Sequence, residues 1–358
     1  MQRLVWIVVS VIAWAATACA GDLRDDGNGS SIGGSVTATD ASADSADSAD
    51  ASGASDAASA DGSGDDAMTK LDVGAVTGAS AGDGGGTDSC TNVDILFVID
   101  DSSSMGDNQQ SLVASFPGFV AGIEASLQNA GSVHIGIVTS DDYAFNDPSC
   151  RHIGDLVTQT GGFDASGQVC GPFASGGRYL DEGEPDLASK FACAAKVGSQ
   201  GNDDEKVMRG LLNALRPELN APDSGACNAG FARDDSLLVI VLISDEDDVP
   251  EPYMCDPNDA FDNPCDTVGS TGTPDEWKAE LGGYKSNLDT NVVVLALVGL
   301  AGDNACGAVP ASKLIGFANR FGANGYTDDV CAASYDQFFA AALPIIDQAC
   351  EDYVPPEG

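Results

Sequence analysis

The chain has 358 residues, with 56 acidic against 15 basic side chains and a formal net charge of −41. Such an acidic surface repels nucleic acid and anionic lipid headgroups, which excludes both as direct partners. It suits cations, cationic partners or a salty habitat, and composition does not separate these three.

Residues 1–18 predict a secretory signal peptide. Arg3 gives a positive start, and an apolar run over 4–13 leads to Ala16-Thr17-Ala18 and Cys19. That run is too short for a comfortable membrane span. The ending resembles a bacterial lipobox, in which Cys19 is acylated and becomes the first mature residue; ordinary cleavage before Cys19 is the alternative. We therefore expect an exported protein at the outer membrane or cell surface, tied to the membrane only through a lipid anchor at Cys19.

Residues 19–89 have the composition of a disordered tether. The stretch 38–66 contains almost only Ala, Ser, Asp and Gly, with a local Ser-Ala-Asp repeat. Its apolar surface is too small to offset the conformational entropy lost on folding. Fourteen aspartates between Gly21 and Ser89 repel one another and extend the segment. We expect a solvated spacer before a folded domain over 90–351 and a short tail over 352–358; a calcium-collecting acidic segment is the alternative.

The cysteine count favours disulfides in an oxidising compartment. Of eleven cysteines, Cys19 as a lipid site leaves ten, enough for five disulfides. A zinc cluster is the alternative, but the chain has no Cys-x-x-Cys and only two histidines. Proximity in the sequence suggests three pairs, and a fourth would tie the two ends of the folded part: Cys150–Cys170, Cys255–Cys265, Cys306–Cys331 and Cys90–Cys350. The sequence does not fix this connectivity.

Strands and helices are predicted to alternate along the folded part. Apolar runs indicate strands at 95–100, 132–142, 236–248 and 291–299. Helices are expected at 112–127, 187–196, 205–215, 275–286, 310–321 and 335–348. Pro117-Gly118 should kink or divide the first helix, and 143–186 is a long excursion rich in Gly, Pro and Asp. The alternation predicts an α/β fold with a doubly wound, mainly parallel central sheet flanked by helices and rich in disulfides.

Three of the predicted strands end in acidic residues: Asp100-Asp101, Asp141-Asp142 and 245–248. In a parallel sheet these ends lie at one edge, where ligands of such sheets bind. Ser102 and Ser104 follow Asp100 on a loop that enters a helix, so both hydroxyls can face one point. Carboxylates and hydroxyls without sulfur or imidazole are hard oxygen ligands, which suit Mg²⁺, Mn²⁺ or Ca²⁺. The alternative is an ordinary strand-to-helix turn capped by Ser104.

The stretch "LFVIDDSSSM" resembles the Asp-x-Ser-x-Ser motif of the von Willebrand factor type A domain, and the element order across 90–351 is similar to that family's. The resemblance implies a metal-ion-dependent adhesion site in which Asp100, Ser102 and Ser104 match the motif. Asp245 matches the family's distal aspartate, which commonly acts through water. It also implies a bound Mg²⁺, or Mn²⁺ or Ca²⁺, and a protein or extracellular-matrix partner whose acidic side chain completes the metal shell. Adhesion, not enzymatic activity, is the expected function.

One residue departs from the family pattern. The family's remaining ligand is a threonine in a Gly-rich loop before a helix, and counting back from Gly210-Leu211 places Glu205 there. A carboxylate adds negative charge, which favours the cation, could shift preference toward Ca²⁺ and makes the metal a poorer acceptor for an anionic partner. In the family, movement of the last helix accompanies binding; 335–348 is the candidate here, unless a Cys90–Cys350 bridge pins it.

Two other functions stay open at this stage. Acids at the edge of a parallel sheet could activate water in a metal-dependent hydrolase, although no general base or second metal set is evident. An acidic surface protein with a degenerate metal site is the other alternative, which the Glu205 departure favours. His134 lies inside a predicted strand and is expected to be packed rather than catalytic, and His152 is expected to be exposed.

Overall fold

The computed structural model describes residues 90–126, 131–202, 204–248, 269–302 and 304–356. The predicted signal peptide, lipid anchor at Cys19 and tether over 19–89 lie outside these residues, as does the predicted Cys255–Cys265 pair. In the part of the chain that is described, no helix has both the length and the apolar character needed to cross a membrane.

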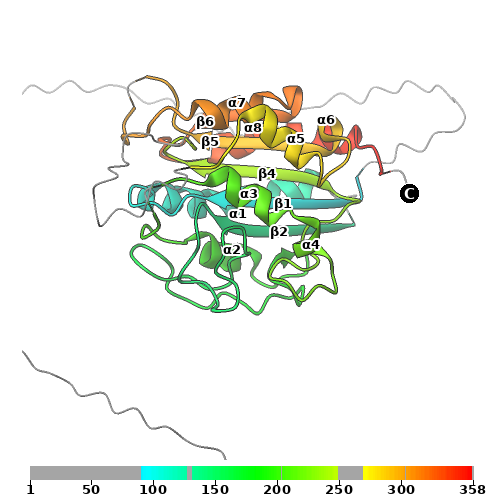
Figure 1. The fold of residues 1–358 in the computed structure, drawn as a ribbon, viewed down its shortest axis with the longest axis horizontal. Coiled ribbons are helices and arrows are strands. Elements are labelled where there is room, and N and C mark those ends of the chain that lie inside the picture. The colour runs from blue at the N-terminus through cyan, green and yellow to red at the C-terminus, as the bar shows by residue number, and fades with distance from the viewer. Residues whose placement is uncertain (1–89, 127–130, 203, 249–268, 303, 357–358) are drawn as a thin grey trace, which may run out of the picture. The chain divides into compact units, whose positions relative to one another are not determined.

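A central sheet organises the described residues (Figure 1). Its strand order is β3-β2-β1-β4-β5-β6, and neighbouring strands are parallel except for the antiparallel pair β2–β3. The strands are β1 Asn92–Ile99, β2 Ser132–Thr139, β3 Leu180–Asp181, β4 Leu237–Ser244, β5 Val292–Val298 and β6 Gly325–Asp329. The predicted α/β class with a mainly parallel sheet is confirmed, and the four predicted strands are all present.

Helices cover both faces of the sheet, so the fold is doubly wound (Figure 1). They are α1 Gly106–Ser126, α2 Leu187–Ala195, α3 Val207–Ala214, α4 Pro217–Asn220, α5 Pro274–Leu281, α6 Leu288–Asn291, α7 Ser312–Asn319, the 3-10 helix η1 Gly322–Asn324, and α8 Asp336–Glu351. Along β1, Ile95 and Phe97 pack in the core shared with α1, α2 and α8, whereas Leu96 and Val98 pack with α3, α5 and α7. Because both faces are covered, β1 is apolar at nearly every position.

The first helix is longer than predicted and is not divided. It begins at Gly106 and continues through Pro117 to Ser126, so of the predicted kink or division at Pro117-Gly118 the division is wrong. Both residues lie on the exposed side of α1, where water can bond the carbonyl that a proline leaves unpaired. On the opposite side Phe116 and Phe119 pack edge-on against Phe97 of β1, with ring centroids 6.0 and 6.3 Å away. This packing holds the helix together across the proline.

Four disulfides join the described residues. Cys90–Cys350 and Cys306–Cys331 are present as predicted. The predicted Cys150–Cys170 pair is wrong, because the bridges are Cys150–Cys227 and Cys170–Cys193, with Cα–Cα distances of 5.7 and 5.6 Å. The excursion after β2 folds into a hairpin in which the Cys170 amide donates to the Thr158 carbonyl at 2.8 Å. That hairpin carries Cys170 to α2 and leaves Cys150 beside the segment before β4.

The chain after α8 returns to the sheet. The Val354 amide donates to Asn291 Oδ1 at 3.0 Å, and Asn291 Nδ2 donates to the Val354 carbonyl at 2.7 Å. Tyr353 is buried. Residues of the predicted tail therefore pack against the end of the sheet at which β5 begins.

Gly210 on α3 provides a test of how closely the helices pack. A β-carbon there would lie 2.5 Å from the Thr139 carbonyl oxygen of β2, which is backbone and cannot move aside. We predict that Gly210→Ala lowers the free energy of unfolding by about 1–3 kcal/mol, measured by urea denaturation with disulfides intact.

Gly118→Ala on α1 is the matched control, because the nearest atom to a β-carbon there is 3.9 Å away. The control should be neutral or more stable by up to about 1 kcal/mol, since alanine favours helix. Equal effects of the two substitutions would contradict close packing of α3 on β2.

Candidate metal site

The carboxyl ends of β1 and β4 meet at one edge of the sheet. Ile99 is paired with Ile243, so the two strands end level with each other. The Asp100 amide extends this ladder by donating to the Ile243 carbonyl at 3.0 Å, and the Ser244 hydroxyl donates to Asp100 Oδ2 at 2.7 Å. Asp100 and Asp245 therefore leave adjacent strands at the same edge, and both are buried.

The turn after Asp100 folds back over its carboxylate. The Ser102 amide donates to Asp100 Oδ1 at 2.8 Å, and the hydroxyls of Ser102 and Ser104 are 3.4 Å apart. The Ser104 hydroxyl is hydrogen-bonded to the Asp245 carboxylate. Ser104 is exposed, whereas Ser102 is only 2 % exposed. Hydrogen bonds and close contacts thus connect these four residues, and Ser104 and Asp245 lie at the same end of the sheet.

Glu205 reaches the same place from a third segment. It lies in the loop just before α3, which begins at Val207 rather than at the predicted residue 205. The Lys206 amide donates to the Ser140 carbonyl at 3.2 Å, which ties this loop to the end of β2. The Glu205 carboxyl lies close enough to Asp100 for the charge of Asp100 to raise its pKa, and it accepts from the Ser140 hydroxyl at 3.3 Å. The structure therefore brings all five sequence-predicted residues to one edge: Asp100, Ser102, Ser104, Glu205 and Asp245.

Burial disfavours the charged forms of the three carboxyl groups. Burial, and next the charge of Asp100, raise the pKa of Glu205 to about 11. Burial raises the pKa of Asp100 to about 6, although hydrogen bonds from Ser244 and the Ser102 amide oppose the shift. Burial also raises the pKa of Asp245. Among the described residues, no ion pair with Lys, Arg or His involves these three groups.

Two buried oxygens in this group have no hydrogen-bond partner among the described residues. They are Glu205 Oε1 and Asp245 Oδ1. A buried carboxylate oxygen without a partner costs free energy, and a cation is one way to compensate it. Carboxylate and hydroxyl oxygens are the ligands that Mg²⁺, Mn²⁺ and Ca²⁺ prefer. The donor set at this edge therefore fits a hard divalent cation.

The serine hydroxyls are a necessary part of such a site. Within the described ranges, one group of three Cys, His, Asp or Glu residues has ligand atoms all within 4.8 Å of one another: Cys150, Asp155 and Cys227. Its two sulfurs are joined in a disulfide, which excludes a thiolate metal site. The carboxylates of Asp100, Glu205 and Asp245 do not form such a group, so a cation there would also need the hydroxyls of Ser102 and Ser104 as ligands.

A second set of acids adjoins the first. Asp101 is 2 % exposed, and burial followed by the charge of Asp141 raises its pKa well above the usual range. Ser140 lies between the two sets, with its hydroxyl 3.4 Å from Asp101 Oδ1 and 3.3 Å from Glu205 Oε2. The acidic residues that follow the strands predicted that acids would meet at this edge. They did not predict that the Asp101 side chain is buried apart from the residues that contact Asp100.

Other acids at this edge cap helices instead. Asp247 accepts from the amides of Lys313 and Leu314 at the start of α7, and Asp248 accepts from the Met208 amide in the first turn of α3. Carboxylates stabilise helix N-termini in this position. Of the acidic run at 245–248, Asp245 is the residue whose carboxylate contacts the Asp-x-Ser-x-Ser turn.

Gln109 is a positioning residue that the sequence did not reveal. Its Nε2 donates to the carbonyls of Asp100 at 2.9 Å and Gly198 at 2.8 Å, and its Oε1 accepts from the Gly198 amide at 2.8 Å. It is fully buried. Gln109 therefore fixes the loop before Glu205 to the end of β1. The available signal was a polar residue at a core-facing position of α1.

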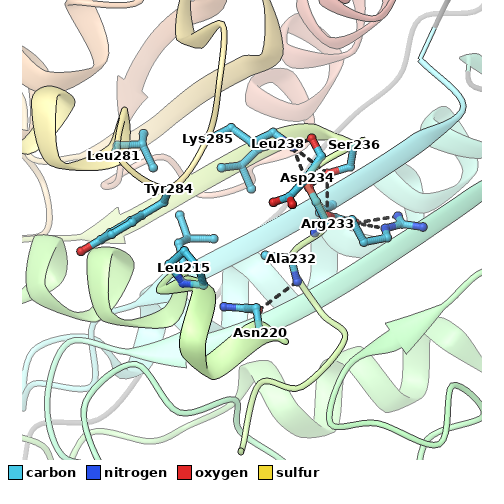
Figure 2. Close-up of a pocket in the computed structure, with 12 residues that line it drawn as sticks. Leu215, Asn220, Ala232, Arg233, Asp234, Ser236, Leu238, Leu281, Tyr284 and Lys285 are labelled. Atoms are coloured by element: carbon cyan, nitrogen blue, oxygen red, sulfur yellow. Dashed lines mark hydrogen bonds and ion pairs between the residues drawn. The ribbon is translucent and has the colours of Figure 1, made fainter. Parts of the chain in front are cut away.

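The opposite end of the sheet holds a small polar pocket with room for about one water molecule (Figure 2). Asp94 at the start of β1 pairs with Arg233 at 2.6 Å, and Lys285 donates to the carbonyls of Arg233 and Asp234 and to the Ser236 hydroxyl. Burial lowers the pKa of Lys285 to about 8. Because these polar groups bond one another, the pocket ties the start of β4 to the segment after α5.

The two histidines have no part in the acidic edge. His134 of β2 is buried, with Nδ1 2.9 Å from the Phe231 carbonyl oxygen and its ring against Tyr179. Burial lowers its pKa. His152 is exposed. Both agree with the predictions.

Comparison with known proteins gives fold likenesses and no family. No family model matches the chain, and no curated protein matches it. Sixty solved chains are similar to it. One is proximal thread matrix protein 1 from the mussel byssus, with 12% identity over 73% of this chain and 49% of that chain, and a TM-score of 0.39. Another is the pilus adhesin SpaC from Lactobacillus rhamnosus GG in an open conformation, with 15% identity over 72% of this chain and 30% of that chain, and a TM-score of 0.36. The chain spans about half or less of these proteins, and at such TM-scores neither likeness bears on function.

The buried acids predict that stability depends on pH when divalent ions are removed. A carboxyl whose pKa is raised by folding binds its proton more tightly in the folded than in the unfolded chain, so stability falls as pH rises between its unfolded and folded pKa values. For Asp100, between its ordinary 3.8 and about 6, this loss is about 3 kcal/mol. We expect the protein in EDTA to unfold at lower urea concentration at pH 8 than at pH 5.

Glu205→Gln should reduce this pH dependence, because it removes a carboxyl that the unfolded chain ionises and the folded chain does not. The expected reduction between pH 5 and pH 8 is on the order of 2–4 kcal/mol. Asp223→Asn, at an exposed loop position, is the control and should keep the full dependence. A wild-type protein equally stable at both pH values would contradict the burial of these acids.

Proposed function

We propose that the folded part is a von Willebrand factor type A domain that binds a protein or extracellular-matrix ligand in a divalent-cation-dependent manner. The observation that carries the proposal is the meeting of three segments, 100–104, 205 and 245, at one sheet edge with two buried carboxylate oxygens left unpaired. A binding function is favoured over catalysis because these groups are held by hydrogen bonds to one another, and no histidine lies among them.

The residues divide into two roles in this proposal. Ser102, Ser104 and Glu205 would hold the cation directly, and Asp100 and Asp245 would hold its water molecules. Mg²⁺, or Mn²⁺ or Ca²⁺, would supply a positive centre to which a partner's acidic side chain can bind. Asp100 also keeps the turn in shape, because its two oxygens accept from the Ser102 amide and the Ser244 hydroxyl.

Glu205 sets this site apart from one built with a threonine. Its carboxyl lies close to that of Asp100 and keeps a proton at neutral pH, because burial and the charge of Asp100 raise its pKa to about 11. A cation would replace that proton and relieve the repulsion between the two groups. The same pair supports the second candidate function, an acidic surface protein whose degenerate site stays closed by the proton and binds no metal.

We also propose that the protein is exported and held at the outer membrane or cell surface. The four disulfides among the described residues suit an oxidising compartment. The signal peptide, acylation of Cys19 and the tether over 19–89 complete this proposal from the sequence. The tether would link the acylated Cys19 to the folded part.

Calorimetry tests the cation site directly. Mg²⁺, Mn²⁺ and Ca²⁺ should each be titrated into the wild-type protein and the double variant Ser102→Ala, Ser104→Ala. We expect the wild-type protein to bind at least one ion and the variant to bind it roughly 10–100-fold more weakly. Ser224→Ala, on an exposed loop, is the control and should bind as the wild type does. Absence of binding heat, or equal affinity of variant and wild type, would favour the degenerate site.

A second experiment separates adhesion from catalysis. The full chain on beads should retain surface proteins or matrix from the producing cells in Mg²⁺ and release them in EDTA. The Ser102→Ala, Ser104→Ala variant should retain at least tenfold less, as roughly expected for a lost metal ligand. Metal-dependent turnover of simple esters or phosphates by the wild type, lost in the same variant, would instead support the hydrolase.

A further inference from the structure

Two exposed apolar residues border the acidic edge. The large apolar side chains that are most exposed among the described residues are Phe163 at 72%, Val169 at 70%, Val309 at 49% and Val354 at 45%. Phe163 and Val309 belong to loops that contact the segments of the candidate site, whereas Val354 lies at the other end of the sheet, beside Asn291. Single exposed apolar side chains are ordinary, but Phe163 and Val309 both lie on loops beside one candidate binding site, where a protein interface would place apolar contacts.

Phe163 is attached to the site by backbone contacts. Its carbonyl accepts from the Ser199 amide at 2.9 Å, in the loop that leads to Glu205. The chain approaches so closely that a β-carbon at Gly198 would lie 2.5 Å from the Phe163 carbonyl oxygen. Gln109 bonds that same Gly198 to Asp100. A path of three hydrogen bonds, through Ser199, Gly198 and Gln109, therefore connects Phe163 to Asp100 at the end of β1.

Asp164, the residue after Phe163, attaches the tip of this hairpin to a second segment. Asp164 lies against Gly106, the first residue of α1, and its Oδ2 accepts from the Ser199 hydroxyl at 2.8 Å. Its φ of 59° is the left-handed region, which a non-glycine residue keeps only when its surroundings hold it there. At the base of the hairpin, Cys170 is bonded to Cys193 of α2. The tip that carries Phe163 is thus attached to Gly106 at the start of α1, which directly follows the turn of Ser102 and Ser104.

Val309 borders the site on the side of Asp245. Its amide donates to the Asp245 carbonyl at 2.7 Å. The loop that carries it is bridged to the segment after β6 by Cys306–Cys331. Asn304 further shapes the loop by donating to the Ala308 carbonyl and accepting from the Gly307 amide, each at 2.7 Å. A disulfide braces the hairpin of Phe163 and Val169 on one side of the acidic edge, and another braces the loop of Val309 on the other side.

We infer that Phe163 and Val309 are contact residues for a protein partner whose acidic side chain enters the cation site with apolar side chains next to it. This inference rests on the proposed function and names the partner's chemistry. Protein interfaces commonly place apolar anchors around a polar contact, and a rigid anchor loses little entropy on binding. The net charge of −41 argues against insertion of these residues into an anionic membrane.

The test uses short random peptides, displayed on phage, that share one fixed aspartate. The full chain is immobilised, and clones that bind in Mg²⁺ and are released by EDTA are collected. We expect them to carry an aromatic or aliphatic residue close to the aspartate. Synthetic versions of these peptides should bind Phe163→Ser about tenfold more weakly than the wild type, as for loss of one interface anchor. Val309→Ser should weaken the same peptides.

Val354→Ser is the matched control, because it also replaces an exposed valine but lies far from the site, and it should leave peptide binding unchanged. Mg²⁺ affinity by calorimetry should be unchanged in all three variants. Selected peptides without apolar enrichment, or equal binding to Phe163→Ser and wild type, would overturn the inference while the cation site stands. A wild-type protein that binds Mg²⁺ but yields no clones released by EDTA would also overturn the inference. Absence of Mg²⁺ binding would mean that the proposed function fails first.

A lipid surface is the remaining alternative for two exposed apolar tips. The full chain should not sediment with phosphatidylcholine vesicles in Mg²⁺ or Ca²⁺. Sedimentation that Phe163→Ser abolishes and Val354→Ser does not would assign the two tips to a membrane and overturn the protein-partner inference.

Discussion

The parallel pairing of β1 with β4 determines where Asp100, the turn of Ser102 and Ser104, and Asp245 lie at the acidic edge. The ladder runs one residue beyond β1, through the Asp100 amide, and the Ser244 hydroxyl then bonds the Asp100 carboxylate at 2.7 Å. A slip of one residue would move Asp100 by about 3.3 Å along β4 and break that bond. The turn of Ser102 and Ser104 follows Asp100, and Asp245 follows Ser244, so the site exists only in this register.

Gathering three carboxyl groups at that edge opposes folding, and the rest of the domain compensates. Asp100, Glu205 and Asp245 all have pKa values raised by burial, so each destabilises the folded chain when it ionises. The α1 side of the sheet counters this with a dense aromatic core around Phe97, and Cys90–Cys350 joins the two ends of the described domain. Replacing these buried acids with neutral residues would make the folded chain more stable. Their presence is therefore easier to explain if a cation binds at this edge and compensates their charge.

The sequence predicted what depends on local pattern and missed what depends on long-range packing. Asp100, Ser102, Ser104 and Asp245 could be placed because apolar strands lead directly into them. Glu205 could be placed only through the resemblance to the type A domain, by counting back from Gly210 and Leu211 to that family's threonine position. The Cys150–Cys227 and Cys170–Cys193 bridges were missed because the excursion after β2 has no periodicity from which its return path can be read. The edge strand β6 was missed because Gly325–Asp329 is polar and half-buried throughout. Gln109 contacts Gly198 only through the fold, and no local signal gives that contact.

The last helix is held differently at its two ends, which limits how the domain can respond to a partner. Cys350 in the last turn of α8 is bridged to Cys90 beside β1, so the C-terminal end cannot slide along the sheet. The N-terminal end is attached by hydrogen bonds: Asn108 of α1 donates to the Tyr335 hydroxyl at 3.3 Å, and the Tyr335 amide donates to the Ser115 hydroxyl at 3.0 Å. These bonds can exchange, and Asn108 lies four residues after Ser104. Asn108 of α1 therefore connects the segment that follows the serine turn to the start of α8, while the disulfide holds the other end of α8.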